Sequence, residues 1–343
     1  MGTLFLVTAI LGYWQYRTSK RQTEIADTDL DSKIVAQLDS PAIEVRVAGL
    51  VEMKRSIERE PNNSERVLEI VEAFIKRSSA IEARTSSSST PPAPPLSVRR
   101  PDVQNALRVF SDLRQDASWG EVCDHIQREI SLHFAPRPTF QLVDLSGADV
   151  RHGKFHLCDF QCSDLREANL SQASLLGCRL NGTNFKGSTF TYARLGQAYL
   201  LAAILDEAQL FGANFTMAVL AGASMKGADL RDCEFAGAYL EALTLRADWS
   251  DPELIHEDPL SLNYARRQVV QTAGALAREG LLFPRILQQG PTYPACDLRG
   301  ADVRGADFSL AVLSGAVLTG ARADQTTRWP QGFDPGSAGV IMT

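Results

Sequence analysis

Four residues between positions 152 and 162 have side chains that could bind a metal ion. His152, His156, Cys158 and Cys162 carry the imidazole and thiol groups that zinc prefers as ligands. A zinc site also needs these four groups to converge on one point in a tetrahedral arrangement. Whether they converge depends on the structural element that carries them.

Carboxylates form a second candidate group. Two Asp or Glu side chains that face each other across a cleft can act as general acid and general base. Asp144, Asp149, Asp159 and Asp164 lie close together in the sequence, at spacings that are multiples of five residues. The sequence contains no His clustered with Ser, Cys or carboxylates in a nucleophilic arrangement, and no glycine-rich phosphate loop.

A strict five-residue period controls this part of the chain. From Leu145 to Leu245 every fifth residue is Leu or Phe, apart from Val150 and Met225. The residue two positions earlier is small in nearly every unit, and it is Ala in twelve of them. A strand repeats every two residues and a helix about every 3.6, so the period fits neither. A fixed short repeat indicates a solenoid in which each turn stacks on the one before.

The five-residue register decides where the candidate side chains point. The large residue fills the axis, and the small one lets the backbone close in beside it. Gly recurs two positions after the large residue, where a corner requires a turn. In this register Cys158 points inward, whereas His152, His156 and Cys162 lie near successive corners. We therefore expect no zinc site, no other cofactor and no catalytic carboxylate pair.

Units such as Ala148-Asp149-Val150, Ala168-Asn169-Leu170 and Ala228-Asp229-Leu230 resemble the pentapeptide-repeat family, whose repeat is A-(D/N)-L-x-x. The resemblance covers residues 143–245 and resumes at Cys296-Asp297-Leu298. It implies an all-β solenoid, namely a right-handed quadrilateral β-helix with four pentapeptides per coil, preceded by an α-helical segment.

The chain as a whole divides into eight expected segments. They are a membrane anchor at 1–21, an α-helical segment at 22–78, a Ser/Pro-rich linker at 79–100, a helical N-terminal cap at 101–138, the β-helix at 139–245, a helical insertion at 246–294, the continued β-helix at 295–325, and a C-terminal cap and tail at 326–343. Within the N-terminal cap, we expect a helix from Trp119 to Phe134 to cover the open end of the β-helix, where backbone groups would otherwise be unpaired.

The membrane anchor rests on an uncharged start. Residues 3–16 carry no charge, and Arg17, Lys20 and Arg21 follow them. The stretch is shorter than the roughly 20 residues of a spanning helix, so an apolar helix packed on the protein is the other interpretation. The basic cluster predicts that the rest of the chain lies at the cytoplasmic face of the plasma membrane. The helical region at 45–75 is similar to that of membrane-anchored bacterial members of the family.

The apolar stripe is the most informative feature of the predicted outer surface. Residues 20 apart should stack on one face, which places Tyr199, Val219 and Tyr239 in one column with Leu201 beside it. Such a patch marks either packing or a partner site. We favour packing against the apolar face of the insertion, which runs from Leu262 to Leu276.

These observations predict a non-enzymatic scaffold, membrane-tethered, that mediates contact with a protein partner; the oligomeric state stays open. The net charge of −6 argues against a nucleic-acid ligand. The alternative is a DNA mimic that binds a type II topoisomerase, as in the gyrase-protecting branch of the family. Mimicry needs a strongly negative rod, and residues 143–245 carry 11 Asp/Glu against 8 Lys/Arg, a net charge of only −3.

Overall fold

The computed structural model describes residues 33, 35–59, 64–81, 94–132, 137–240, 243–244, 292–293 and 295–343. They belong to two compact units, residues 1–70 and 71–343. Helix α2 (Ile43–Arg59) lies in the first unit and buries Leu50, Met53 and Ile57. Their spacing of three and four residues places them on one helix face. No helix in these described ranges is long and apolar enough to cross a membrane, and the anchor predicted at 1–21 lies outside them.

Helix α3 (Ser64–Ser79) has Glu65 in its first turn and Lys76 and Arg77 in its last, which complements the helix dipole. The α-helical segment expected before the repeats is therefore present. In the second unit, the part of α3 from Val71 onward buries Phe74 and Ile75.

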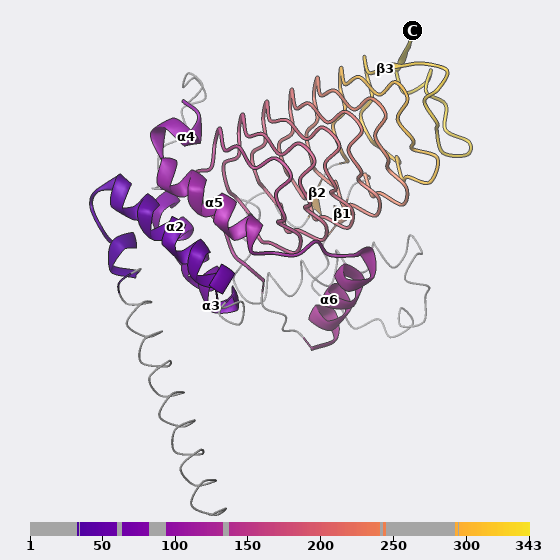
Figure 1. Ribbon diagram of the computed structural model, residues 1–343. Coiled ribbons are helices and arrows are strands. Elements are labelled where there is room, and N and C mark those ends of the chain that lie inside the picture. Colours follow the sequence, from indigo (N-terminus) through magenta and orange to yellow (C-terminus); the bar gives the residue numbers. More distant parts are fainter. Residues whose placement is uncertain are drawn as a thin grey trace, which may run out of the picture. The chain divides into compact units, whose positions relative to one another are not determined.

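A stack of coils makes up most of the second unit. Parallel bridges join residues 20 apart without interruption, from Thr139 with Asp159 to Val219 with Tyr239. Backbone bonds support each bridge, as in Asn169 N–H to the Ala148 carbonyl at 2.8 Å. Four pentapeptides therefore complete one coil, as the resemblance implies, and Figure 1 shows the coils lying one on the next. We call residues 139–240 and 295–328 the coil stack.

The corners of the coils need a left-handed backbone. All corner residues from Leu142 to Gly237 have φ between 54° and 71°. From Gly147 onward, each lies in a turn closed by a bond such as Ala148 N–H to the Leu145 carbonyl at 3.0 Å. A positive φ at this turn position favours glycine, which confirms the corner role predicted for Gly. Twelve of the corners nevertheless carry other residues.

The coil stack is interrupted after Leu240 and not at residue 245 as predicted. Strand β1 (Leu243–Thr244) pairs antiparallel with β2 (Thr292–Tyr293), and Cys296 N–H bonds to the Leu240 carbonyl at 2.7 Å. Asp297 then takes the place in the ladder beside Ser224. The physical reason is size, since Leu243 would overfill an inward slot that holds a small residue in every earlier unit except that of Val143. Residues 245–291 lie outside the described ranges.

Chain segments before the repeats pair with the edge of the first coil. Asp144 N–H bonds to the Ser79 carbonyl at 2.6 Å, and Ile81 N–H bonds to the Leu142 carbonyl at 2.7 Å. Leu96, which begins helix α4 (Leu96–Arg99), donates its N–H to the Gly147 carbonyl at 3.0 Å. The linker predicted at 79–100 is therefore wrong at both ends, because the open edge recruits these residues as hydrogen-bond partners.

Helix α5 (Pro101–Asp112) covers the rest of that edge. The Gln104 side chain accepts from Asp149 N–H at 2.9 Å and donates to the Asp149 carbonyl at 2.6 Å. Ser111 Oγ accepts from Lys154 N–H at 2.9 Å. The Phe110 ring lies edge-on to Phe140, with centroids 4.9 Å apart, and stacks on Phe155 at 6.0 Å.

Helix α6 (Trp119–Leu132) packs on a side of the coils, which corrects the prediction that it covers their end. Val122 is fully buried in a cluster with Leu176. Gln197 Nε2 donates to Cys123 Sγ at 2.9 Å. The helix begins with a capping box, in which Ser118 Oγ accepts from Glu121 N–H at 3.3 Å and the Glu121 carboxylate accepts from Ser118 N–H at 2.7 Å. Since α5 already satisfies the edge, α6 is left to bury its apolar face elsewhere.

The last coil is closed by the residues that follow it directly. Phe308 stacks on Trp329 with centroids 5.4 Å apart, and Trp329 stacks on Phe333 at 5.1 Å. Strand β3 (Arg322–Ala323) pairs in parallel with β4 (Ile341–Met342). Figure 1 shows this end of the stack in yellow.

Candidate interaction surface

The predicted stripe residues lie together on one face of the coils. Parallel bridges join Tyr199 to Val219 and Val219 to Tyr239. Tyr199 is 4% exposed, and Leu201, Val219 and Tyr239 are each 2% exposed. With Ala221 they form one hydrophobic cluster. These side chains are thus closed to solvent within the chain itself. The contact expected with Leu262–Leu276 falls outside the described residues.

A buried polar network continues the same face toward the first coil, and sequence reasoning missed it. The Asp159 carboxylate, 2% exposed, accepts from Gln141 Nε2 at 2.8 Å and from Gln161 Nε2 at 3.1 Å. Arg179 Nη1 lies 3.5 Å from the same carboxylate. Asn181 links this network to the stripe, because it donates to Gln161 Oε1 at 3.2 Å and accepts from Leu201 N–H at 3.0 Å. Such a bonded network favours one arrangement of this face.

A partly exposed aromatic cluster lies on another face. Tyr192 is 54% exposed, and its ring meets Phe211 edge-on with centroids 5.4 Å apart. The Arg231 guanidinium lies over the Phe211 ring, 5.6 Å from its centroid. Gly212 leaves the space that the Tyr192 ring occupies, since a Cβ there would lie 2.5 Å from it. The signal in the sequence was the 20-residue step from Phe211 to Arg231, which sequence analysis did not use.

The zinc-type residues are directed apart. Cys158 is fully buried in the axis, and burial raises the pKa of its thiol to about 12. His156 is buried between the coil and the segment after α5, and this burial, reinforced by the Arg114 charge, lowers its pKa to about 4. His152 is an exposed corner residue with φ of 58°. Across the described ranges, no group of three or more His, Cys, Asp or Glu is placed to hold a metal ion.

Five Asp carboxylates on the outer surface of the described coils are bonded to Arg. In five units an Asp accepts from the Arg two residues later. These pairs are Asp149–Arg151, Asp164–Arg166, Asp229–Arg231, Asp297–Arg299 and Asp302–Arg304, with closest N–O distances of 2.6 to 2.8 Å. The Arg231 guanidinium lowers the pKa of the Asp229 carboxyl, and Arg304 does the same for Asp302. The carboxylates are therefore ionised and locally neutralised.

Comparison with known proteins agrees with this architecture. The family profile described as pentapeptide repeats matches in 8 copies, at residues 163–200, 203–241 and 295–327. A pentapeptide repeat protein of the Arabidopsis thaliana thylakoid lumen has a solved structure, is 34% identical, and is matched over 31% of this chain and 69% of its own, with a TM-score of 0.21. The chain belongs to the pentapeptide-repeat family.

Two other solved structures of pentapeptide-repeat proteins are more distant. Rfr23 from the cyanobacterium Cyanothece 51142 is 21% identical over 48% of this chain and 63% of its own, with a TM-score of 0.23. This chain thus spans less than two thirds of that relative. QnrB1, a plasmid-mediated fluoroquinolone resistance protein, is 17% identical over 60% of this chain and 79% of its own, with a TM-score of 0.31. A search of curated protein sequences finds no match.

Proposed function

We propose that this protein is a non-enzymatic scaffold that binds a protein partner through the faces of a right-handed, four-sided β-helix. The partly exposed cluster of Tyr192, Phe211 and Arg231, with Tyr192 at its exposed edge, is the observation that carries this proposal. Tyr and Arg dominate binding energy at protein interfaces, because a large rigid side chain with a polar group gains much from burial. The bulky Tyr192 also occupies a left-handed corner, with φ of 56°, where glycine would be less strained.

The apolar stripe serves the scaffold from within, by holding the insertion. Supporting this, Tyr199, Val219 and Tyr239 are at most 4% exposed. Strands β1 and β2 also bring the two ends of the insertion together beside the coil. Hydroxyl-radical footprinting of the full chain tests the contact. The double variant Leu262→Asp, Leu276→Asp should increase labelling of Tyr199 and Tyr239 several-fold, whereas unchanged labelling would refute the contact.

The DNA-mimic alternative is weaker on electrostatic grounds. A duplex presents one charge about every 1.7 Å of its axis, with no compensating cations of its own. Here an Arg two residues later neutralises each of the five Asp residues described above, for example Arg231 at Asp229. Measuring gyrase binding at low and high salt separates the two functions. A DNA mimic should bind gyrase at low salt and lose binding at high salt, whereas the scaffold should not show such salt-sensitive binding.

The scaffold is proposed to be tethered at the cytoplasmic face of the plasma membrane through residues 1–21. The uncharged residues 3–16 and the basic residues after them support this location. The full chain should sediment with membranes, whereas a chain beginning at Gln22 should stay in the supernatant. If both stay in the supernatant at low and high salt, the tether is refuted.

Affinity purification from native membranes with mass spectrometry tests partner binding. The wild type is compared with Tyr192→Ala and with the control Gln172→Ala. Gln172 is a corner residue in the same column one coil earlier, with φ of 58° against 56° for Tyr192. Backbone strain is thus matched between the two variants. A partner retained by Gln172→Ala and lost with Tyr192→Ala supports the proposal, and equal recovery with both variants overturns it.

A further inference from the structure

One open face of the coil stack carries no charge over three successive coils. Its outward and corner residues lie at 169–172, 189–192 and 209–212, and none of them is Asp, Glu, Lys, Arg or His. Parallel bridges join Asn169 to Thr189 and Thr189 to Gln209, so the three segments stack directly on one another. We call these outward and corner residues the neutral patch. At roughly 4.8 Å per coil, the patch extends about 14 Å along the stack.

The neutral patch is open to solvent. Every one of its residues is at least partly exposed, and Tyr192 in the middle coil is 54% exposed. Among the described residues, the side chains of Thr189, Thr191 and Gln209 find no hydrogen-bond partner. Their donors and acceptors are therefore available to a bound molecule.

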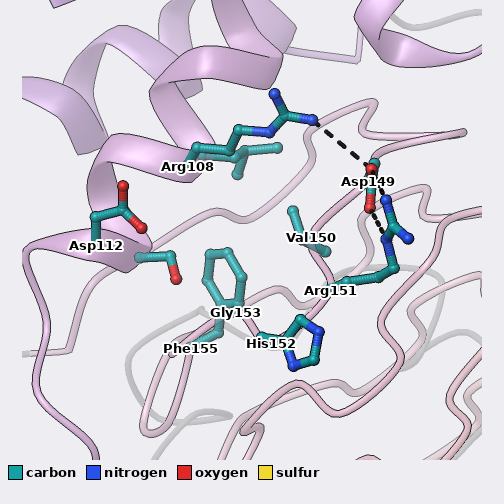
Figure 2. Close-up of a pocket in the computed structure, with 10 residues that line it drawn as sticks. Arg108, Asp112, Asp149, Val150, Arg151, His152, Gly153 and Phe155 are labelled. Atoms are coloured by element: carbon teal, nitrogen blue, oxygen red, sulfur yellow. Dashed lines mark hydrogen bonds and ion pairs between the residues drawn. The ribbon is translucent and has the colours of Figure 1, made fainter. Parts of the chain in front are cut away.

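The coils on either side of the patch carry Asp–Arg ion pairs. On the side of the first coil, Asp149 accepts from Arg151 at 2.8 Å, and Arg108 of α5 approaches the same carboxylate to 3.6 Å (Figure 2). On the other side, Asp229 accepts from Arg231 at 2.6 Å. A neutral centre is thus bordered along the stack by charges that neutralise each other.

The other sides of the same three coils do not offer such a surface. The adjoining face carries charged residues in each coil, at 164–167, 184–187 and 204–207. The face that follows the patch carries Arg194 and packs against α6, with Leu176 buried in the contact. The apolar stripe, on the fourth face, is at most 4% exposed. The neutral patch is therefore the face of these coils that is both open and uncharged.

The composition of the patch matches that of a protein interface. The core of an interface is depleted in charged side chains and enriched in aromatic residues and Arg, and a polar rim surrounds it. Antibody binding sites likewise combine Tyr with Ser, Asn and Gly. In the patch, Tyr192 and Phe211 supply the aromatic surface, and Arg231 lies at its edge over the Phe211 ring.

We propose that the neutral patch is the core of the partner interface and that it selects a partner whose contacting surface is uncharged and rich in hydrogen-bonding groups. The inference rests on the scaffold function proposed above and adds the chemistry of the partner. A charged group of the partner would lose its water at the patch without meeting an opposite charge, which is costly. Neutral amides and hydroxyls would instead pair with Thr189, Thr191 and Gln209. Binding should therefore depend little on salt.

Salt dependence tests this chemistry on the full chain. The probe is the protein that the immobilised wild type captures from detergent-solubilised native membranes and that Tyr192→Ala fails to capture. Its captured amount should change less than about threefold between about 0.05 and about 0.5 M NaCl. A larger loss at high salt would overturn the neutral interface and leave the scaffold function intact. If no protein depends on Tyr192 for capture, the scaffold function itself fails, and this inference with it.

A charge added to the patch tests its position more strongly than truncation, because truncating residues around a hot spot costs little. Thr189→Lys places a cation in the patch. Asn184→Lys places one at the equivalent position of the adjoining face in the same coil, and both native residues are partly exposed. Thr189→Lys should weaken capture at least about tenfold, because the ammonium group would be buried without a counter-ion. Asn184→Lys should not weaken it.

Thr189→Gln separates the effect of charge from that of size or of a damaged fold. Its side chain is long and uncharged and keeps hydrogen-bonding groups, so capture should be retained. Equal effects of Thr189→Lys and Asn184→Lys, or equal losses with Thr189→Lys and Thr189→Gln, would contradict the assignment.

A second copy of the chain is the competing occupant of the patch. Sedimentation velocity of the purified full chain distinguishes it from a different partner protein. We expect the wild type and Thr189→Lys to sediment as the same species. A dimer formed by the wild type and lost with Thr189→Lys would assign the patch to self-association and overturn the partner assignment.

Discussion

The two ends of the coil stack are closed by different means. At the first coil, side chains and backbone from α3, α4 and α5 pair with the edge; Gln104, for instance, acts on Asp149, 45 residues later. At the last coil, the chain turns back directly, and Trp329 stacks on Phe308 while β4 pairs with β3. The repeat therefore ends on local sequence alone, whereas its beginning depends on helices from an earlier part of the chain.

The two ends differ most in how deeply their aromatic side chains are buried. Phe110 is fully buried against Phe140 and Phe155, whereas Trp329 is half-buried. We expect Phe110→Ala to lower the free energy of unfolding by about 4 kcal/mol through the cavity it leaves. Trp329→Ala should lower it by about 2 kcal/mol, because less area is lost. Urea denaturation followed by circular dichroism measures both, and a larger loss at Trp329 would reverse the comparison.

Between the two ends of the coil stack, substitutions at an inward and at an outward position test the five-residue register. Ala208 is 1% exposed in an inward slot, and its neighbour Gln209 is exposed. Ala208→Leu should cost up to about 3 kcal/mol through overpacking. Gln209→Leu should change the free energy of unfolding by less than about 0.5 kcal/mol, as is usual at the surface. Similar melting temperatures for the two variants would be incompatible with the assigned register.

Lowering the pH should destabilise the fold through a histidine of the first coil. The pKa of His156 is about 4 in the folded chain, below its ordinary value of 6.5, because burial and the Arg114 charge disfavour the protonated ring. The Arg194 charge lowers this pKa further, whereas the Asp116 and Glu121 carboxylates raise it in part. The unfolded chain therefore binds more protons between these values, so stability falls as the pH drops from 6.5 to 4. We expect a loss of about 2 kcal/mol over this window.

His156→Gln provides the control for this pH dependence. Denaturant unfolding measured at pH 6.5 and 4.5 should show a smaller difference for His156→Gln than for the wild type. Residues 295–343 contain no His, so the last coil offers no equivalent group. An unchanged pH dependence in the variant would exclude His156 as its source.

Corner geometry gives the smallest expected effect. Gly227 has φ of 65°, and no heavy atom lies within 4 Å of the position that a Cβ would take there. Gly227→Ala therefore measures backbone strain alone, and we expect it to cost about 1 kcal/mol. Glu207→Gly, at the same corner one coil earlier with φ of 60°, should relieve strain and cost little or nothing. Thermal unfolding distinguishes the two, and a stabilising Gly227→Ala would contradict the left-handed corner.

The coils were predictable from sequence because their rules are local. A small residue such as Ala208, a large one such as Leu210 and a corner residue such as Gly212 each follow from position in the five-residue period. The end of the repeat at Leu240 was missed by five residues, since Leu243 and Leu245 keep the period although Leu243 is too large for its slot. The five-residue pattern alone does not show whether the Leu243 side chain fits the volume of its inward slot.

The edge closure and the polar network were not predictable in the same way. Gln104 and Ser111 are ordinary polar residues of an amphipathic helix until they meet the edge of the first coil. Likewise, Gln161 and Asn181 resemble solvated outward residues, yet both are at most 3% exposed. Their roles depend on tertiary partners, which supply the hydrogen bonds that make their burial stable.

Amide hydrogen exchange at the first edge tests most directly whether α5 closes it. In the described part of the chain, Asp149 N–H donates to Gln104 Oε1, and Lys154 N–H donates to Ser111 Oγ. In the wild type we predict slow exchange at both amides. In Gln104→Ala, exchange at Asp149 should accelerate at least about tenfold while an interior amide such as that of Asn169 stays protected. Fast exchange at Asp149 in the wild type, or no change in the variant, would contradict this closure.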